Sequence, residues 1–500
     1  MALQRAQLVE RLAQRGVIMA PAALEALAGE ESALEYIDEI AGSCKEFVVS
    51  EKTVAGFLEG KGLVNKVVQV EAGEASGFDP PAKHVESMLE LSIKDSDVTG
   101  KSKCGGNVED FVRHFRNRFE RQRDALRGMR TDSFGTFSIR DAKEQVNKEF
   151  RVIAMVYDKK VTKNGHLLIE IEDEGGTANA LVPKDSPLMP EALKIIQDEV
   201  LALDVYASKS KLLIVKGFKL PGSMLQEKRK RLIADDISIA FISDIHIGSR
   251  YFMAENFQRM IRFLNGHGSE QEREIAGKIK YISIAGDLVD GIGVFPNQEK
   301  QLLTKNIYTQ YEMLGEFLKA IPPHIEVIIA PGNHDGVRLA EPQPSLPAEF
   351  TESVKGQANL HFVGNPSRHS IHGLELLIYH GTSIDGLIAH SAALKQGYDR
   401  PEIMGAFMLS RRHMCPLYGE DAVVPEEFDY LLIGDTPDIF HFGHIHRNGH
   451  IEDYNGTFIV NSGTWQDRTD YQVRMGHNPT PCLLPVYSLK TGKVQVLNFK

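Results

Sequence analysis

Three apolar runs in the second half of the chain each end directly at side chains that bind metal ions in proteins. They are residues 237–243 before Asp244, 281–285 before Asp287, and 325–330 before Asn333. Apolar residues at helical spacing lie between the runs, at 254–264 and 301–320. Alternating strands and helices predict an α/β domain, in which the carboxyl ends of the strands form a site at one edge of the sheet.

The full set of polar side chains falls in five short segments. They are Asp244-Ile245-His246, Gly286-Asp287-Leu288-Val289-Asp290, Gly332-Asn333-His334-Asp335, His380-Gly381 and Gly443-His444-Ile445-His446. Any one segment could be an ordinary turn. Together they supply two ligand sets with one carboxylate available to bridge them, as a two-metal phosphoester hydrolase requires. Carboxylate, amide and imidazole groups without a thiolate favour Mn²⁺ or Fe over structural zinc.

Length and charge limit the class of protein. A chain of 500 residues is too long for one core, so several domains are expected. It has no long apolar run and no signal region at its start, and we expect a cytoplasmic protein without a membrane partner. The net charge of −11 is unusual for a free-standing binder of duplex DNA. Metals or a partner would have to attract a nucleic-acid substrate.

Four domains or segments are expected from the pattern of the sequence. They are a small helical domain at 1–60, a flexible linker with an arginine-rich helix at 61–140, an OB-fold domain at 145–222, and a phosphodiesterase domain at 235–500. Residues 1–140 are expected to be dispensable for the rest. The helix, residues 111–130, carries seven arginines. It could contact nucleic acid or a partner, or present a solvated face.

The OB-fold prediction rests on the order of elements in residues 145–222. Three strands, a short helix at 190–198 and two further strands succeed one another. OB-folds often bind single strands by stacking bases on aromatic residues. Here aromatic residues are few and acidic ones gather at 170–174, so a protein-docking or structural role is at least as consistent.

The five segments resemble the calcineurin-like metallophosphoesterase pattern D-x-H, G-D-x-x-D, G-N-H-D, H, G-H-x-H. The resemblance implies a layered calcineurin-like phosphoesterase domain. It also implies a first metal held by Asp244, His246, Asp287 and His446, and a second held by Asp287, Asn333, His380 and His444. His334 would be a catalytic residue that faces the phosphate and the leaving group, together with the bridging Asp287. Asp290 and Asp335 would orient ligands or support the structure. Arg338 would contact phosphate or lie on the surface.

A closer resemblance links the chain to one branch of this superfamily. The segments 331–338, 341–344, 411–413, 416–419 and 437–444 resemble the small subunit of archaeal family D DNA polymerases. This implies a 3′→5′ exodeoxyribonuclease that proofreads as part of a two-subunit replicative DNA polymerase. Its partners would be a large catalytic subunit, DNA with a 3′ end and, through the complex, a sliding clamp. Its cofactors would be two divalent ions, with Mn²⁺ favoured and Mg²⁺ or Fe as alternatives.

Two other functions stay open at the level of the sequence. One is a free-standing metallophosphatase or phosphodiesterase, which would not need an OB-like domain. The other is a non-catalytic scaffold subunit of a polymerase, which has no physical need for buried carboxylates around a pocket.

Overall fold

The structure, a computed structural model, describes residues 73–500 except 94–95, 128–134, 143 and 225–229. Before residue 73 it describes only Leu8, Arg11, Tyr36, Ile40 and two short strands, so the predicted helical domain at 1–60 lies almost entirely outside the described residues. Those strands, β1 (Ile18–Met19) and β2 (Val48–Val49), pair in parallel. The chain divides into two compact units, residues 1–70 with 302–305, and residues 71–301 with 306–500. In the described parts, no helix has the length and apolar character needed to cross a membrane.

The first large sheet has six strands in the order β13-β12-β11-β10-β19-β20. They are β10 (Ser238–Ile242), β11 (Ile279–Ala285), β12 (Glu326–Ala330), β13 (Leu360–Phe362), β19 (Leu483–Ser488) and β20 (Val494–Asn498). The first four run parallel, and β19 joins β10 in the antiparallel direction. Every residue of β10 and β11 is buried, which requires cover on both faces of the sheet.

The second sheet also has six strands, in the order β17-β18-β16-β15-β14-β3. They are β3 (Leu89–Glu90), β14 (Ser367–Ile371), β15 (Leu374–Tyr379), β16 (Ile439–Phe442), β17 (Asn448–Tyr454) and β18 (Thr457–Ser462). The central strands β15, β16 and β18 run parallel to one another. Their carboxyl ends therefore meet at one edge, as do those of β10, β11 and β12.

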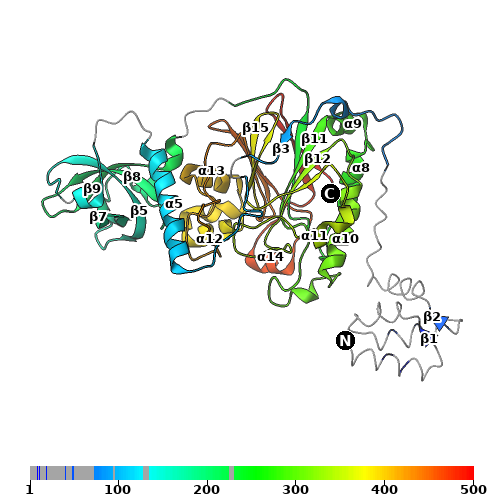
Figure 1. Cartoon of the computed structure of the whole chain (residues 1–500), viewed down its shortest axis with the longest axis horizontal. Coiled ribbons are helices and arrows are strands. Elements are labelled where there is room, and N and C mark those ends of the chain that lie inside the picture. Colours follow the sequence, from blue (N-terminus) through cyan, green and yellow to red (C-terminus); the bar gives the residue numbers. More distant parts are fainter. Residues whose placement is uncertain are drawn as a thin grey trace. The chain divides into compact units, whose positions relative to one another are not determined.

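The two sheets share one apolar core, which includes Phe241 and Ile328 of the first sheet and Ile378 and Phe458 of the second. Helices α8 (Ala254–Leu264), α9 (Glu270–Lys278) and α10 (Ile307–Lys319) lie beside the first sheet (Figure 1). Helices α12 (Ser383–His390) and α13 (Glu402–Arg411) pack into a core with residues of the second. The predicted mixed α/β architecture is confirmed. The name calcineurin-like for this layering rests on the sequence resemblance.

Residues 149–219 form a closed barrel of five strands. They are β5 (Glu149–Val161), β6 (Leu167–Asp173), β7 (Gly176–Val182), β8 (Val200–Ala207) and β9 (Leu213–Lys219), with a short helix α7 (Met189–Ala192) between β7 and β8. The ring closes because β5 pairs with both β6 and β8, and β7 pairs with β9. Alternate side chains fill the interior of the barrel. This arrangement is consistent with the predicted OB-fold.

Two short elements precede the barrel. They are β4 (Thr136–Phe137), which pairs with β5, and α6 (Ile139–Ala142).

Within the predicted linker over 61–140 the arginine-rich helix is present as expected, but residues 81–84 and 89–90 form ordered elements, so the prediction of a flexible linker is wrong there. Strand β3 pairs with β14, and the short helix η1 (Pro81–His84) packs on α9. The arginine-rich segment forms α5 (Val108–Arg127). The loss of apolar periodicity before residue 107 suggested a linker, but β3 gains order from a sheet edge that local sequence does not reveal.

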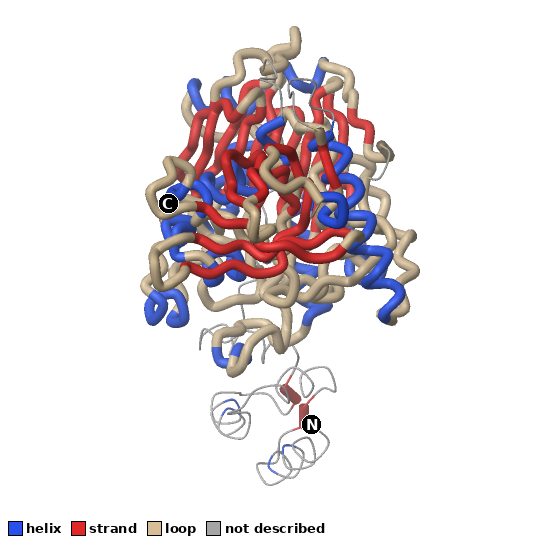
Figure 2. The backbone as a smooth tube through the Cα atoms, turned by 90° about the vertical axis from the view of Figure 1, so that its left-hand side faces the viewer, coloured by secondary structure: helices blue, strands red, loops and turns tan. Residues whose placement is uncertain are grey.

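Helix α5 joins the barrel to the large domain. Its Phe119 and Leu126 pack against barrel residues Ile153, Met155, Val200 and Ala202. On its other side, Arg118 Nε donates to Asp429 Oδ2 at 2.8 Å. The apolar face of the helix and its buried Arg118 therefore make contacts within the chain. Figure 2 shows the strands of the larger compact unit, residues 71–301 with 306–500, gathered in the interior with helices along the flanks.

Candidate metal centre

The edge of the two sheets collects all the predicted site residues. Asp244 and His246 follow β10, Asp287 and Asp290 follow β11, and Asn333 and His334 follow β12. From the second sheet, His380 follows β15, and His444 and His446 follow β16. These strands are parallel within each sheet, so their five carboxyl ends bring the side chains into one cluster.

Five of these residues have a left-handed backbone, which non-glycine residues seldom adopt. Their φ angles are 51° for Asp244, 55° for His246, 52° for Asp287, 70° for His444 and 57° for His446. Such strain persists only where the surroundings fix it, and it concentrates at functional sites. The fold holds these side chains in place at a cost in backbone energy.

Two glycines allow the strand ends to approach closely. A β-carbon on Gly443 would lie 2.5 Å from Asp244 Oδ2, and one on Gly286 would lie 2.5 Å from His380 Nδ1. Neither distance is possible for real atoms. Glycine at these two positions therefore permits the close approach that any other residue would block.

A first group of ligand atoms comes from Asp244, His246 and His446, whose ligand atoms lie within 4.8 Å of one another. The Nε2 atoms of His246 and His446 are 3.0 Å apart, and His446 Nε2 lies 3.3 Å from Asp244 Oδ1. All three side chains are buried or nearly so. Two imidazole nitrogens and a carboxylate oxygen thus point at a common centre.

A second group comes from Asp287, His380 and His444, again within 4.8 Å. His380 Nε2 lies 3.4 Å from Asp287 Oδ2 and 2.9 Å from Asn333 Oδ1. Asp287 also lies near the first group, with Oδ2 at 3.7 Å from His246 Nε2. Asp287 therefore lies between the two groups, where a bridging carboxylate is required.

The second ring nitrogen of each of these histidines has its own partner. The pairs are His246 Nδ1 with Asp290 Oδ1 at 3.0 Å, His380 Nδ1 with Ala285 O at 2.8 Å, His444 Nε2 with Asp385 Oδ2 at 3.0 Å, and His446 Nδ1 with Gln472 Nε2 at 2.9 Å. Such outer contacts orient imidazole ligands. The oxygen acceptors beside His246, His380 and His444 also hold the ring proton away from the nitrogen that would face a metal, whereas the amide nitrogen of Gln472 only donates and therefore orients His446 without holding a proton on Nδ1.

Two of these partners were missed by the sequence reasoning. Asp385 belongs to α12, and Gln472 belongs to α14 (Asp470–Met475), where it is also the N3 residue of a capping box with Thr469. Asp385 lies five residues after His380, and Gln472 lies 26 residues after His446, but neither belongs to a motif and neither spacing marked it as a partner. Asp290, in contrast, was predicted to orient a ligand or support the structure, and its contact with His246 shows how it could orient one.

Asp335 and Arg338 have structural partners. Asp335 accepts hydrogen bonds from Gly332 N at 2.8 Å and from Tyr311 Oη at 3.1 Å. Arg338 donates from Nε to Pro342 O at 2.9 Å and lies 3.3 Å from Glu426. Asp335 therefore ties the loop after β12 to α10, and Arg338 is engaged with neighbouring loops.

The electrostatics of the cluster favour cations. Burial raises the pKa of Asp287, but His380 and His334 outweigh this and hold it well below its usual range. Burial lowers the pKa of His380, yet Asp287 and Asp244 raise it to about 10. The carboxylates thus create a field that stabilises positive charge. The donor set and this field both fit divalent metal ions bound by oxygen and imidazole ligands.

His334 lies at the edge of the cluster. Its Nδ1 is 2.8 Å from Asp290 O, and its Nε2 is 4.0 Å from Asp287 Oδ2. The carbonyl accepts only from a protonated Nδ1, so Nε2 is the atom that faces the site. A ligand atom of His334 also lies within 4.8 Å of those of His246 and Asp287. The catalytic assignment of His334 stays a prediction from the resemblance.

Comparison with known proteins defines the class of the chain. Residues 239–448 match the family described as the B subunit of DNA polymerases alpha and epsilon. Proteins named DNA polymerase II small subunit are similar over most of the chain. The one from Methanocaldococcus jannaschii is 41% identical over 420 residues, 82% of this chain and 69% of that protein.

Two further relatives with the same name agree. The Methanothermobacter thermautotrophicus protein is 36% identical over 410 residues, 81% of this chain and 82% of its own length. The Archaeoglobus fulgidus protein is 38% identical over 400 residues, 78% of this chain and 77% of its own length. The chain belongs to the family of archaeal DNA polymerase II small subunits. The family expected from the sequence is confirmed.

Proposed function

We propose that this chain is the 3′→5′ exonuclease subunit of a two-subunit DNA polymerase and removes nucleotides from the 3′ end of DNA by two-metal hydrolysis. The observation that carries the proposal is the position of Asp287 between two groups of ligand atoms. The relatives are named small subunits, which implies a large catalytic subunit as the partner.

The geometry supports the metal-binding residues that the resemblance implies. Asp244, His246 and His446 would hold one ion, and Asn333, His380 and His444 the other, with Asp287 shared. When bound, the two ions would supply positive charge that stabilises the phosphate and would lower the pKa of the attacking water. Mn²⁺ is the ion we favour, with Mg²⁺ or Fe as alternatives.

His334 would serve the leaving group. Because Asp290 O fixes Nδ1, Nε2 is free to deliver a proton to the 3′ oxygen or to stabilise charge on it. Burial lowers the pKa of His334 even though Asp287 opposes this. An anionic phosphate beside the ring would raise that pKa again and favour the protonated imidazole in the complex.

The alternatives are weaker on this structure. A non-catalytic scaffold would gain nothing from five left-handed residues and buried carboxylates at one sheet edge. A free-standing phosphatase does not account for similarity to polymerase subunits over about four-fifths of the chain.

The test uses the purified full chain and single-stranded DNA labelled at its 5′ end. We expect a ladder of shortened products with Mn²⁺ and none with chelator. Asp287→Asn should abolish it because the variant withdraws the shared charge. Asp124→Asn is the matched control, since that carboxylate is 71% exposed on α5. Digestion by Asp287→Asn at the control rate would refute the proposal.

A further inference from the structure

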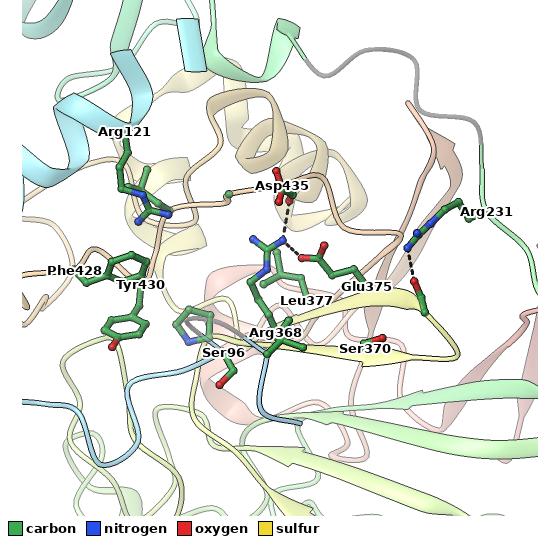
Figure 3. A pocket seen from close by; sticks show the side chains of 15 residues that line it. Ser96, Arg121, Arg231, Arg368, Ser370, Glu375, Leu377, Phe428, Tyr430 and Asp435 are labelled. Atoms are coloured by element: carbon green, nitrogen blue, oxygen red, sulfur yellow. Dashed lines mark hydrogen bonds and ion pairs between the residues drawn. The ribbon is translucent and has the colours of Figure 1, made fainter. Parts of the chain in front are cut away.

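A cavity of about 480 Å³ lies against the β14–β15 hairpin of the second sheet (Figure 3). Its walls include the hairpin of β14 and β15, residues 428–435 and Arg121 of α5. Glu375 near the start of β15 lines it, whereas His380 follows the end of that strand. Leu377, the lining residue of β15 nearest to the metal centre, is three residues before His380, roughly 10 Å along the strand at about 3.3 Å per residue, and the cavity shares no residue with the metal centre. The cavity is therefore a separate site.

Two guanidinium groups converge inside the cavity at Gly434. A β-carbon there would lie 3.3 Å from Arg368 Nη1 and 4.0 Å from Arg121 Nη2, so the missing side chain leaves the space between them open. Burial, with Arg412 and Arg121 nearby, lowers the pKa of Arg368 to about 10, although Asp435 opposes this. Like charges held together in a partly buried place are relieved by a bound anion.

Acidic side chains accompany the arginines of the cavity. Arg368 pairs with Glu375 and donates from Nη2 to the backbone oxygen of Asp435 at 2.9 Å. Among the described residues, three arginines and two carboxylates line the cavity, and the third arginine, Arg231, pairs at the far end with Asp438. The formal charges are therefore balanced, and a bound phosphate would be held by the guanidinium nitrogens that face Gly434, which are Arg368 Nη1 and Arg121 Nη2.

Aromatic rings flank the converging arginines. The guanidinium of Arg121 lies 4.3 Å from the centre of the Phe428 ring, and the rings of Phe428 and Tyr430 are 4.9 Å apart. Figure 3 shows both rings beside Arg121, with Arg368 between them and Arg231. Guanidinium groups bind phosphate and aromatic faces stack on bases, and the volume suits a small ligand.

We propose that this cavity binds a nucleotide, with its phosphate between Arg121 and Arg368 and its base against Phe428 or Tyr430. A free 5′-nucleotide and one nucleotide of a single DNA strand offer the same chemistry. The proposal does not depend on the exonuclease activity, because its residues are distinct from those of the metal centre.

The test measures binding to the full chain in chelator, which keeps divalent ions from the metal centre. The probes are deoxyadenosine 5′-monophosphate, deoxyadenosine, an oligothymidylate of about twelve nucleotides, and a peptide of alternating aspartate and glutamate. We expect Arg121→Gln and Arg368→Gln each to weaken binding of a phosphate-bearing probe about tenfold or more. Arg116→Gln should leave it unchanged, because Arg116 lies on the same helix, is 57% exposed and does not line the cavity.

A second variant keeps the charges and removes the space. Gly434→Leu should abolish binding while the protein stays folded, because Gly434 has no left-handed backbone that would strain a side chain. Binding of the mononucleotide would identify a free-nucleotide site, and binding of the oligonucleotide alone a strand site. Unchanged affinity in all three cavity variants would overturn the proposal. So would capture of the acidic peptide alone, which would make the cavity a protein-docking site.

Discussion

Asp385 Oδ2 lies 3.0 Å from His444 Nε2, and this contact decides which nitrogen of His444 turns toward Asp287. Tyr398 Oη donates to the other carboxylate oxygen of Asp385 at 2.9 Å, so the carboxylate is itself held in place. Because α12 supplies Asp385, a helix outside the sheets helps to set the geometry of the metal centre.

Asp385→Asn should weaken metal binding or activity by about 10- to 100-fold, the usual effect of removing an outer partner of an imidazole ligand. The measurement is activity titrated against Mn²⁺ concentration. A shift of the curve to higher Mn²⁺ with a restored maximum indicates a positioning role. An unaltered curve would show that Asp385 does not orient His444.

His334→Ala should retain both metals and lower the turnover rate by about 100-fold or more, the scale for a positioned acid. Elemental analysis of the purified protein, beside single-turnover rates, separates the two effects. If one metal is lost in proportion to protein, His334 is a ligand and its assigned role is wrong.

Arg118→Met should lower the free energy of unfolding by about 3 kcal/mol, because it removes the only arginine that pairs with the buried Asp429 among the described residues. The carboxylate then keeps two histidines and the backbone N–H of Leu431 as partners. Urea unfolding followed by circular dichroism measures the change. Arg116→Met is the control on the same helix, with an exposed side chain and an expected change below about 0.5 kcal/mol. Equal effects would mean that α5 is not fastened through Asp429.

The pH dependence of stability should reflect His369. Burial lowers its pKa to about 4, although Leu91 O partly opposes this. In the unfolded chain this histidine takes up a proton as the pH falls below about 6.5. In the folded chain it stays neutral until the pH falls to about 4. The free energy of unfolding therefore decreases as the pH drops from about 6.5 to about 4. His369→Gln should show a smaller loss of urea midpoint between pH 7 and pH 4.5 (values set by the usual histidine pKa of about 6.5). An identical loss would exclude His369 as a source.

Deletion of residues 1–72 should leave the thermal midpoint of the remaining chain and its activity unchanged, because residues 1–70 belong to the other compact unit. Deletion of residues 1–140 should instead destabilise it. That change removes β3 and α5 and uncovers Ile153 and Met155 of the barrel. Thermal melts of both truncated chains, and co-purification with the large subunit, provide the comparison. Equal midpoints would restore the linker interpretation of residues 61–140.

The sequence by itself determined the identity of the candidate ligands and the class of the domain that carries them. The apolar runs before Asp244, Asp287 and Asn333 predict strands that end near these residues. Because the carboxyl ends of parallel strands meet at one edge of a sheet, the three residues were expected to lie close together. The element order also predicted an OB-fold in residues 145–222, although the pairs that close the barrel, β5 with β8 and β7 with β9, join strands that do not follow one another. Periodicity and side-chain chemistry were enough to predict the α/β domain and its cluster of polar side chains, whereas the ligands of each metal and the role of His334 came from the family resemblance.

Only the tertiary structure decided what lies between distant segments. The roles of Asp385, Gln472 and α5 arise from contacts between distant segments or between domains, which no local pattern records. The same holds for the cavity, where Arg121 and Arg368 meet over Gly434. The physical reason is that the chemical type of a ligand depends only on the residue itself. The orientation of its side chain, its burial and the charges around it depend on which segments the fold brings together.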